Sequence, residues 1–397
     1  MDFRETPELS AFRHEVRAWL ADNLPAGFGT PGYRGPREPG ERLAVAKSWQ
    51  KKLCEGGYAG FSWPREYGGR GATIMEQLVW SEEYARAWPP DLIMISVGIS
   101  LVGPVLISKG LPWQRERFLE KILSGEEVWC QGFSEPDAGS DVAALRTRGE
   151  VRDDEIVVTG QKIWTSFAQH SQWCILVVRT DPDAAKKHDG MTFLLVDMSS
   201  PGIDTRPLTE MTGEDWFNEV FFNEVRVPIG NVVGEIDKGW DVVMNTLSHE
   251  RASAAPHAKL ESELELLRDL ARRTPRNGAT AAEDPVIRQK LAQYSAEVTA
   301  LRINAYRNAE IVRRTGHPGP QGSLLKLGWS ELDQQVKELA SEMLGPYALI
   351  EAPDPLAVDR GHWAYELLWS RAASIYAGTS EIQRNIIAER VLRLPRS

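Results

Sequence analysis

The hydrophobic period of the chain changes in its middle, and this change limits the folds open to it. Four short runs rich in β-branched and aromatic residues lie between residues 129 and 238: EIVVTG, WCILVVR, MTFLLVD and EVFFNEVRVP. Turn signals such as DD, DG and SSPG separate them, and no helix of useful length fits between them. We therefore predict a compact antiparallel β domain in this region.

N-terminal to this β region, apolar residues follow a helical spacing. They recur in three stretches, and each stretch predicts an amphipathic helix. The stretches contain Phe12, Val16, Trp19 and Leu20; Leu78, Val79, Glu82 and Glu83; and Phe118, Ile122 and Leu123, which Gly125 ends. A Gly- and Pro-rich loop, GTPGYRGPREPGER, separates the first two helices.

The helical period also returns after the β region. It covers residues 240–271, 285–314, 323–344 and part of 361–376, and a last helix begins near Ser380. Long helices joined by short loops are typical of a helix bundle.

A chain of 397 residues is too long for one simple core. We predict an α+β fold that is mainly α. It has an N-terminal helical domain at residues 1–128, a central antiparallel β domain at 129–238 and a C-terminal helix bundle at 239–397.

Composition narrows the classes of function. The net charge is 46 − 56 = −10, which argues against a nucleic-acid partner. Cys54, Cys130 and Cys174 form no C-x-x-C pair, so neither a disulfide framework nor a metal site is indicated. The N-terminus is charged and has no apolar signal region, and no apolar run reaches the ~18 residues of a membrane span. We expect a cytoplasmic protein without a membrane span.

The densest local signal is CQGFSEPDAGSD, residues 130–141. A run of Gly, Pro, Ser and Asp is often only a surface turn that connects two domains. It can also be a loop whose backbone amides and hydroxyls meet a polar cofactor.

A second signal lies near the C-terminus, in IYAGTSEIQRN, residues 375–385. Ser380 and Gln383 have the S-x-x-Q spacing of a capping box, and Gly378 supplies a flexible turn before it. Helix N-termini attract anions and polar cofactor groups, so we expect a ligand contact there.

CQGFSEPDAGSD resembles the signature of the acyl-CoA dehydrogenase family almost letter for letter. Three further blocks resemble that family in the same order: GQKIWTSFA at 160–168, the β-domain exit at 211–240 and IYAGTSEIQRNIIAERVL at 375–392. The resemblance covers essentially the whole chain.

The resemblance implies FAD held between the β domain and the C-terminal bundle. It also implies α,β-dehydrogenation of an acyl-CoA thioester, with electrons passed to an electron-transfer flavoprotein. The family's cofactor positions match Gln131, Phe133, Ser134, Ser140, Trp164, Thr165, Ser166, Thr379 and Glu381. The serine that matches Ser140 also lies near the acyl-CoA in the family.

The reaction needs a base for the Cα proton, and a carboxylate in an apolar site suits that role. In many relatives the carboxylate occupies the position of Ala377, which cannot remove a proton. Other members, including the isovaleryl and long-chain types, place a glutamate on the first long helix of the bundle, directly before an arginine. Glu250 precedes Arg251 here, so Glu250 is the expected base.

Two neighbours of Glu250 have competing or supporting roles. His249 is the rival base, although adjacent helix residues point about 100° apart and cannot both face one ligand. Arg251 could orient the glutamate or meet the substrate near its thioester.

The chain departs from the family pattern in two places. RRTPRNGATAAEDPVIRQKLA lacks the Arg-x-x-Phe-Gly element that reaches the flavin pyrophosphate of a neighbouring subunit, and EMLGPYALIEAP lacks the usual Gly-Gly pair. Members that act on steroid or ring-bearing thioesters are similar, and some form hetero-oligomers with one catalytic subunit type. We expect a homotetramer or dimer, with a hetero-oligomer as the alternative. A non-catalytic partner subunit and a flavin oxidase or monooxygenase stay open as functions.

Overall fold

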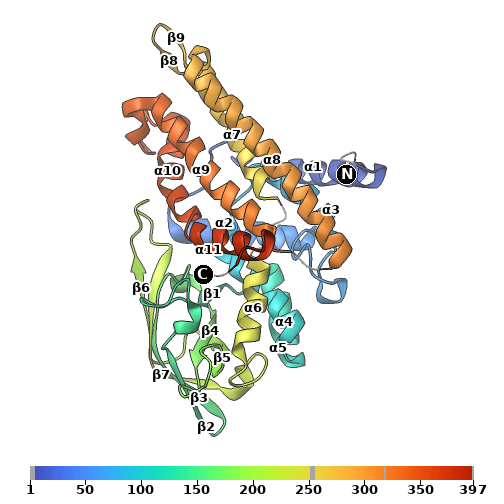
Figure 1. The fold of residues 1–397 in the computed structure, drawn as a ribbon, viewed down its shortest axis with the longest axis vertical. Helices are drawn as coiled ribbons and strands as arrows, with labels where there is room; N and C mark the ends of the chain where they lie inside the picture. The colour runs from blue at the N-terminus through green and yellow to red at the C-terminus, as the bar shows by residue number, and fades with distance from the viewer. Residues whose placement is uncertain (1–4, 251–254, 317–318, 396–397) are drawn as a thin grey trace. The chain divides into compact units, whose positions relative to one another are not determined.

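The chain folds into helices, then strands, then helices, which confirms the predicted fold class (Figure 1). The structure is a computed structural model that describes residues 5–250, 255–316 and 319–395. Two compact units make it up. The sheet unit comprises Pro36–Gly71 and Asp91–Glu250, and the bundle unit comprises Met1–Gly35, Ala72–Pro90 and Arg251–Ser397.

A seven-stranded sheet forms the centre of the described part of the sheet unit. Its strands are β1 (Trp129–Gly132), β2 (Arg148–Arg152), β3 (Glu155–Lys162), β4 (Trp173–Arg179), β5 (Met191–Asp197), β6 (Ile203–Leu208) and β7 (Phe217–Pro228). The order is β1-β4-β2-β3-β7-β6, and β5 pairs with β4. Inner positions of β4 and β5 are buried without alternation, because both faces of these strands are covered.

The sheet departs from the predicted antiparallel pattern at β1. This strand pairs in parallel with β4, so that Cys130 lies opposite Cys174. One further parallel contact joins Arg148 of β2 to Arg179 of β4, while the remaining pairings of the sheet are antiparallel. β1 follows a helix rather than a hairpin turn, so no tight turn imposes an antiparallel neighbour on it.

Helices complete the sheet unit: α2 (Pro39–Glu55), α4 (Gly103–Lys109), α5 (Pro112–Ser124) and α6 (Gly239–Glu250). The predicted end of the third N-terminal helix is confirmed, because Gly125 closes α5 with φ 73°, a conformation that glycine adopts at little cost. A π-helical turn at Gly98–Val102 precedes α4, and both segments bury apolar residues.

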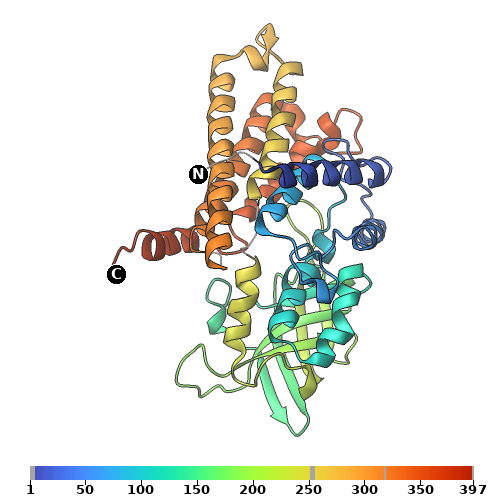
Figure 2. The same ribbon diagram turned by 90° about the vertical axis from the view of Figure 1, so that its right-hand side faces the viewer.

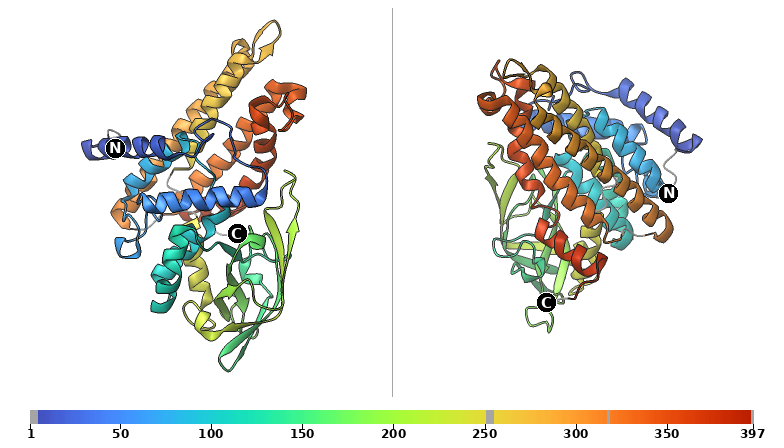
Figure 3. Two further views of the ribbon diagram at one scale, coloured as in Figure 1. Left: turned by 180° about the vertical axis from the view of Figure 1, so that it is seen from behind. Right: turned by 45° about the horizontal axis from the view of Figure 1, so that its top comes forward.

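The bundle unit contains α1 (Pro7–Asn23), α3 (Ile74–Arg86), α7 (Pro256–Arg273), α8 (Pro285–Thr315), α9 (Gly322–Leu344), α10 (His362–Ala373) and α11 (Ser380–Ile386). Figure 2 shows α7 and α8 side by side, joined at their far ends by a small hairpin of β8 (Pro275–Arg276) and β9 (Ala279–Thr280). α9 packs against α8 on one side and α10 on another (Figure 3). No helix in the described ranges is both long and apolar enough to cross a membrane.

The single long helix expected over residues 240–271 is wrong. α6 ends at Glu250, and α7 begins at Pro256 after Ala255, whose φ of −141° and ψ of 63° are not helical. Proline has no backbone N–H and is favoured in the first turn of a helix, so it marks a start rather than an interior position.

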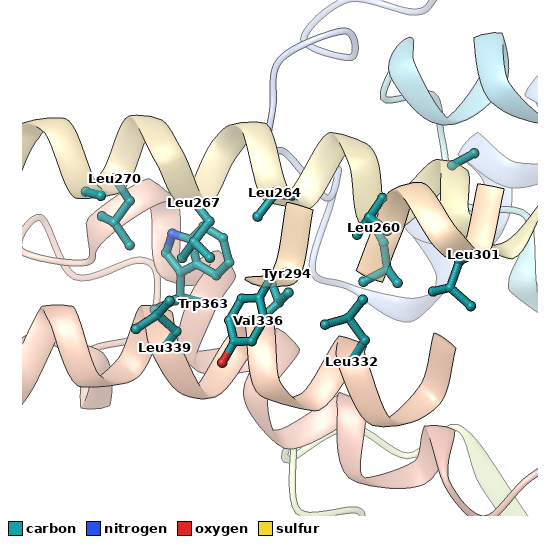
Figure 4. Close-up of a cluster of buried hydrophobic side chains, with 14 of the residues drawn as sticks. Leu260, Leu264, Leu267, Leu270, Tyr294, Leu301, Leu332, Val336, Leu339 and Trp363 are labelled. Carbon is teal, nitrogen blue, oxygen red and sulfur yellow. The ribbon is translucent and has the colours of Figure 1, made fainter. Parts of the chain in front are cut away.

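Interlocking apolar side chains hold the bundle together (Figure 4). The buried side chains labelled in the figure are Leu260, Leu264, Leu267 and Leu270 of α7; Tyr294 and Leu301 of α8; Leu332, Val336 and Leu339 of α9; and Trp363 of α10. Each fully buried leucine contributes about 1.5–3 kcal/mol, so this seam is the main source of the bundle's stability.

Charged groups are also buried in the bundle. Lys337 of α9 is fully buried, with its Nζ 2.6 Å from Asp333 Oδ1 and 3.7 Å from Glu263 Oε2 of α7. His362 Nε2 of α10 lies 2.9 Å from the same glutamate oxygen. Burial alone would raise the pKa of Glu263, but Lys337 and His362 hold it well below its usual range. Lys337 therefore compensates two buried carboxylates, Asp333 and Glu263.

We predict that Lys337→Met lowers the free energy of unfolding by about 3–5 kcal/mol, because it leaves buried carboxylates without their cation. Urea denaturation followed by circular dichroism measures this loss. Lys290→Met is the control. Lys290 pairs with Glu342 at 2.5 Å, but both side chains are about 40% exposed (39% and 40%). An exposed pair contributes about 0–1 kcal/mol. Equal losses in the two variants would contradict the prediction.

Candidate active site

The first expected cofactor loop leaves strand β1 and makes a tight turn. Gln131 is half-buried at the end of the strand, and Phe133 is buried beyond it. Glu135 and Ala138 exchange two backbone hydrogen bonds of 2.9 and 3.0 Å, which close the turn. Ser134 lies half-buried before this turn, and Ser140 lies exposed after it. The loop therefore presents hydroxyls on both sides of a rigid turn.

A buried ion pair ties this loop to the end of β3. Lys162 is fully buried, and its Nζ lies 2.8 Å from Glu135 Oε1. The same ammonium donates to the backbone oxygen of Phe133 at 3.1 Å. Glu135 also accepts hydrogen bonds from the backbone N–H groups of Arg146 at 2.6 Å and Thr147 at 2.9 Å. One carboxylate thus joins both ends of the loop to the sheet.

The two charges of this pair act on each other. Burial lowers the pKa of Lys162 below its usual range, while Glu135 opposes that shift. Burial alone would raise the pKa of Glu135, but the Lys162 ammonium and the donated hydrogen bonds lower it overall. Removing either partner would leave a charge or a polar group in the interior without compensation.

The second expected loop begins directly after Lys162. The backbone N–H of Ile163 donates to the oxygen of Ser134 at 2.9 Å, so the two loops lie against each other. Trp164 has φ 58°, a left-handed conformation, and 59% of its surface is exposed. Such strain in a bulky residue is often found where an active site is shaped. The rings of Trp164 and Phe217 lie nearly perpendicular, with a centroid distance of 5.8 Å.

Thr165 is held rigidly beside this indole. It exchanges backbone hydrogen bonds of 3.1 Å with Asn218 of β7, in both directions. Its side chain is fully buried, yet its hydroxyl has no hydrogen-bond partner in the described part of the chain. Ser166 is half-buried next to it. A buried hydroxyl without a partner is a group that a bound polar ring can satisfy.

The residues present fit a flavin. The hydroxyl of Thr165 can hydrogen-bond to a ring nitrogen, the exposed indole of Trp164 offers a flat face, and Gln131 and Ser134 add polar groups on the adjoining loop. No set of three His, Cys, Asp or Glu side chains in the described ranges is arranged to hold a metal ion.

The C-terminal block lies in the bundle unit. Its helix cap differs by one residue from the expected one. Thr379, not Ser380, caps α11, because its hydroxyl accepts from the N–H of Ile382 at 3.2 Å. Both residues carry a hydroxyl, so spacing alone could not choose between them. Gln383 instead donates to the oxygens of Ala377 and Gly378, at 3.0 and 3.1 Å, and fixes the turn.

This turn also leaves polar groups for a ligand. The hydroxyl of Ser380 and the side-chain oxygen of Gln383 are buried and have no partner among the described residues. Glu381 is exposed in the first turn of α11. Ala377 has φ 54°, and its methyl group offers no acid–base chemistry.

The expected base lies on α6. Glu250 is the last residue of α6, whose Val242, Val243 and Thr246 are buried. The side chains of His249 and Glu250 lie outside the described residues, and so does the whole of Arg251. The structure thus gives the backbone place of Glu250 in the sheet unit.

Sequence reasoning missed two residues of the site. Glu135 and Lys162 lie inside the two quoted motifs, but only their burial identifies them as a pair. The available signal was Lys162, the one charged residue of GQKIWTSFA, since a buried charge requires an opposite partner.

Comparison with known proteins agrees along the whole chain. Residues 6–126, 130–225 and 237–392 match the family models for the N-terminal, middle and C-terminal domains of acyl-CoA dehydrogenases. Acyl-CoA dehydrogenase IpdE1 of Mycolicibacterium smegmatis is 40% identical over 405 residues, covering 98% of each chain. The protein of the same name from Mycobacterium tuberculosis is 40% identical over 392 residues, again covering 98% of each.

Solved structures agree as well. The Tcur3481-Tcur3483 steroid ACAD has a TM-score of 0.85 at 31% identity, covering 100% of both chains. The ChsE4-ChsE5 complex from Mycobacterium tuberculosis has a TM-score of 0.84 at 31% identity, also with full coverage of both chains. By sequence over its full length and by fold, the chain belongs to the acyl-CoA dehydrogenase family.

Proposed function

We propose that the chain is a cytoplasmic FAD-dependent enzyme that removes the α and β hydrogens of an acyl-CoA thioester and passes electrons to an electron-transfer flavoprotein. The observation that carries this proposal is the hydroxyl of Thr165, buried without a partner beside the exposed indole of Trp164. The Lys162–Glu135 pair that ties the two loops together supports it.

When bound, FAD supplies the acceptor for the hydride that leaves Cβ. Thr165 and Ser166 would hold the ring by hydrogen bonds and would stabilise negative charge on it. Gln131, Phe133 and Ser134 of the other loop would also hold the cofactor. Ser140 serves both the cofactor and the acyl-CoA, and Thr379 and Glu381 contact the cofactor from the start of α11.

Glu250 is the proposed base for the Cα proton. Ala377 lacks an ionisable side chain, so the base must come from another position. A carboxylate shielded from water has a pKa raised toward neutrality, which suits removal of a weakly acidic proton. Arg251 is proposed to meet the substrate near its thioester.

The relatives point to the substrate class and to the assembly. One solved neighbour is described as the Tcur3481-Tcur3483 steroid ACAD, and another as the ChsE4-ChsE5 complex. We propose a bulky, ring-bearing thioester as the substrate. A homotetramer or dimer is the simplest assembly, and a hetero-oligomer with a related chain is the alternative.

The role of Glu250 predicts that Glu250→Gln loses flavin reduction. Straight, branched, aromatic and steroid-type acyl-CoAs are added anaerobically to the FAD-loaded protein, and bleaching of the flavin absorbance is timed. We expect the steroid-type thioester to bleach the wild type. The variant should be slower by about 10²–10⁴-fold, the usual contribution of a positioned base.

His249→Gln is the matched control, because it removes the rival base from the adjacent position. Bleaching that persists in Glu250→Gln but fails in His249→Gln would move the role to His249. A chain that is colourless alone, and that makes a co-expressed related chain yellow, would instead be a non-catalytic partner subunit. Rapid consumption of oxygen by the reduced protein would identify an oxidase or monooxygenase.

The Lys162–Glu135 pair generates a second prediction. Lys162→Met should bind FAD at least about tenfold more weakly, because breaking a buried pair costs about 3–5 kcal/mol and releases the loop that holds Ser134. The ratio of flavin to protein absorbance after gel filtration measures retention. The double variant Lys162→Met with Glu135→Gln should recover part of it, since no unpaired charge then stays buried.

Lys187→Met is the control for that experiment. Lys187 pairs with Asp141 at 3.0 Å, but the two side chains are 56% and 57% exposed. FAD retention should be unchanged in this variant. Equal retention in Lys162→Met and Lys187→Met would show that the buried pair is not needed for the cofactor site.

A further inference from the structure

The second cofactor loop, residues 163–169, starts with a bulge against strand β7. Lys162 at the end of β3 lies opposite Val220 of β7. Further on, Thr165 exchanges both backbone hydrogen bonds with Asn218. Between these two pairs the loop has one residue more than β7. Such a β-bulge re-aims a side chain, and here the exposed indole of Trp164 lies within it.

Two residues of this loop have left-handed backbone conformations. Trp164 has φ 58° and Phe167 has φ 55°. A bulky residue keeps such a conformation only where the surrounding structure imposes it. The N–H of Phe167 donates to the oxygen of Trp216 at 2.7 Å, which secures the far end of the loop. A separate contact secures the near end, around Trp164.

The side chain of Asn218 provides that contact. Asn218 is fully buried on β7, and its Nδ2 donates to the backbone oxygen of Thr165 at 3.1 Å. The same Nδ2 donates to Oε1 of Gln169 at 2.6 Å. Gln169 is fixed in turn, because its Nε2 donates to the backbone oxygen of Asp215 at 2.6 Å. Both hydrogen bonds that the Asn218 amide donates therefore end on the second cofactor loop.

The amide of Asn218 acts through its donor side. Its Oδ1 is buried and has no hydrogen-bond partner in the described part of the chain. A buried amide is costly unless it is hydrogen-bonded, whereas an apolar side chain of the same size would pack in this strand without that cost. The bonds to the loop thus account for an asparagine at this position of β7.

We propose that Asn218 is a positioning residue for the flavin, because its amide holds the bulge that presents Trp164 and Thr165 to the ring. This inference rests on the proposed function. In this role Asn218 acts through the loop and does not touch the cofactor. A loop released from Asn218 populates a relaxed conformation, so the apparent affinity for FAD falls with the fraction of molecules that keep the competent one.

The test compares two substitutions at Asn218 with one at a second asparagine of the same unit. Asn218→Leu removes the donor at nearly unchanged size, and Asn218→Ala removes most of the side chain. Asn231→Ala is the matched control, because Nδ2 of Asn231 also donates to a backbone oxygen, that of Leu195 in β5, at 2.8 Å. This bond joins Asn231 to a strand rather than to a cofactor loop.

The full-length protein is stripped of FAD and titrated with FAD, and the change in flavin fluorescence gives the Kd. The absorption spectrum of the saturated protein and the Tm without FAD are recorded alongside. A change in the spectrum reports on the surroundings of the ring, which a merely structural role of Asn218 would leave unaltered.

We expect Asn218→Leu and Asn218→Ala to bind FAD about ten- to a hundredfold more weakly, because a buried acceptor without its donor disfavours the competent loop. The absorption maximum of bound FAD should also shift, since Trp164 and Thr165 are displaced. Gln169 is half-buried, and Gln169→Leu removes one acceptor of the amide, so it should weaken FAD binding by only about two- to tenfold. Asn231→Ala should lower Tm and keep the wild-type Kd and spectrum.

Two results would overturn the inference. The first is a wild-type Kd and spectrum in both Asn218 variants, and the second is an equal weakening in Asn231→Ala, which a general loss of stability produces. If neither Asn218 variant folds, the Kd of Gln169→Leu decides the outcome. Failure of the proposed function shows in the wild type instead. A wild type that takes up no FAD overturns the cofactor assignment, whereas equal binding by the wild type and the Asn218 variants overturns the positioning role alone.

Discussion

The buried contact between Lys162 and Glu135 is the interaction on which the candidate cofactor site depends. It joins the end of β3 to a loop that starts thirty residues earlier in the chain. The Glu135 carboxylate also accepts hydrogen bonds from two backbone N–H groups of that loop. A loop of Gly, Pro and Ser has high conformational entropy and would otherwise move freely. The ion pair restricts this loop and holds it against the residues that follow Lys162.

Buried charged side chains also join helices in the bundle unit. Glu82 joins α1, α3, α7 and α8, while Glu263 and Lys337 join α7 to α9. Apolar burial supplies most of the stability but has little directionality. Hydrogen-bonded charges have strict geometry, so they fix the register of the helices at chosen points.

Local features of the fold could be predicted from sequence where one short stretch carries the whole signal. The Phe118 stripe and Gly125 determine the extent of α5, and Leu78 and Val79 lie on the buried face of α3. Features that depend on distant partners could not. The parallel pairing of β1 with β4 joins residues far apart in the chain, and no local turn signal indicates this pairing.

The features of the candidate site also divide into those that local sequence predicts and those that depend on distant partners. The motifs locate Ser134, Trp164 and Thr165, but the pairing that joins their loops requires the fold. Spacing also failed at α11, where Thr379 and Ser380 are both able to cap, and the backbone selects Thr379. A single helical period concealed the break before α7, because one proline was the sole local signal for it.

The loops around Ser134 and Thr165, held by Lys162 and Glu135, are proposed to form the FAD site. A crystal structure of the purified protein with FAD bound is the decisive test of this proposal. We expect the flavin ring beside the indole of Trp164, with the hydroxyl of Thr165 hydrogen-bonded to the ring at about 2.7–3.2 Å. FAD bound elsewhere, or a Thr165 hydroxyl bonded within the protein and turned from the ring, would contradict it.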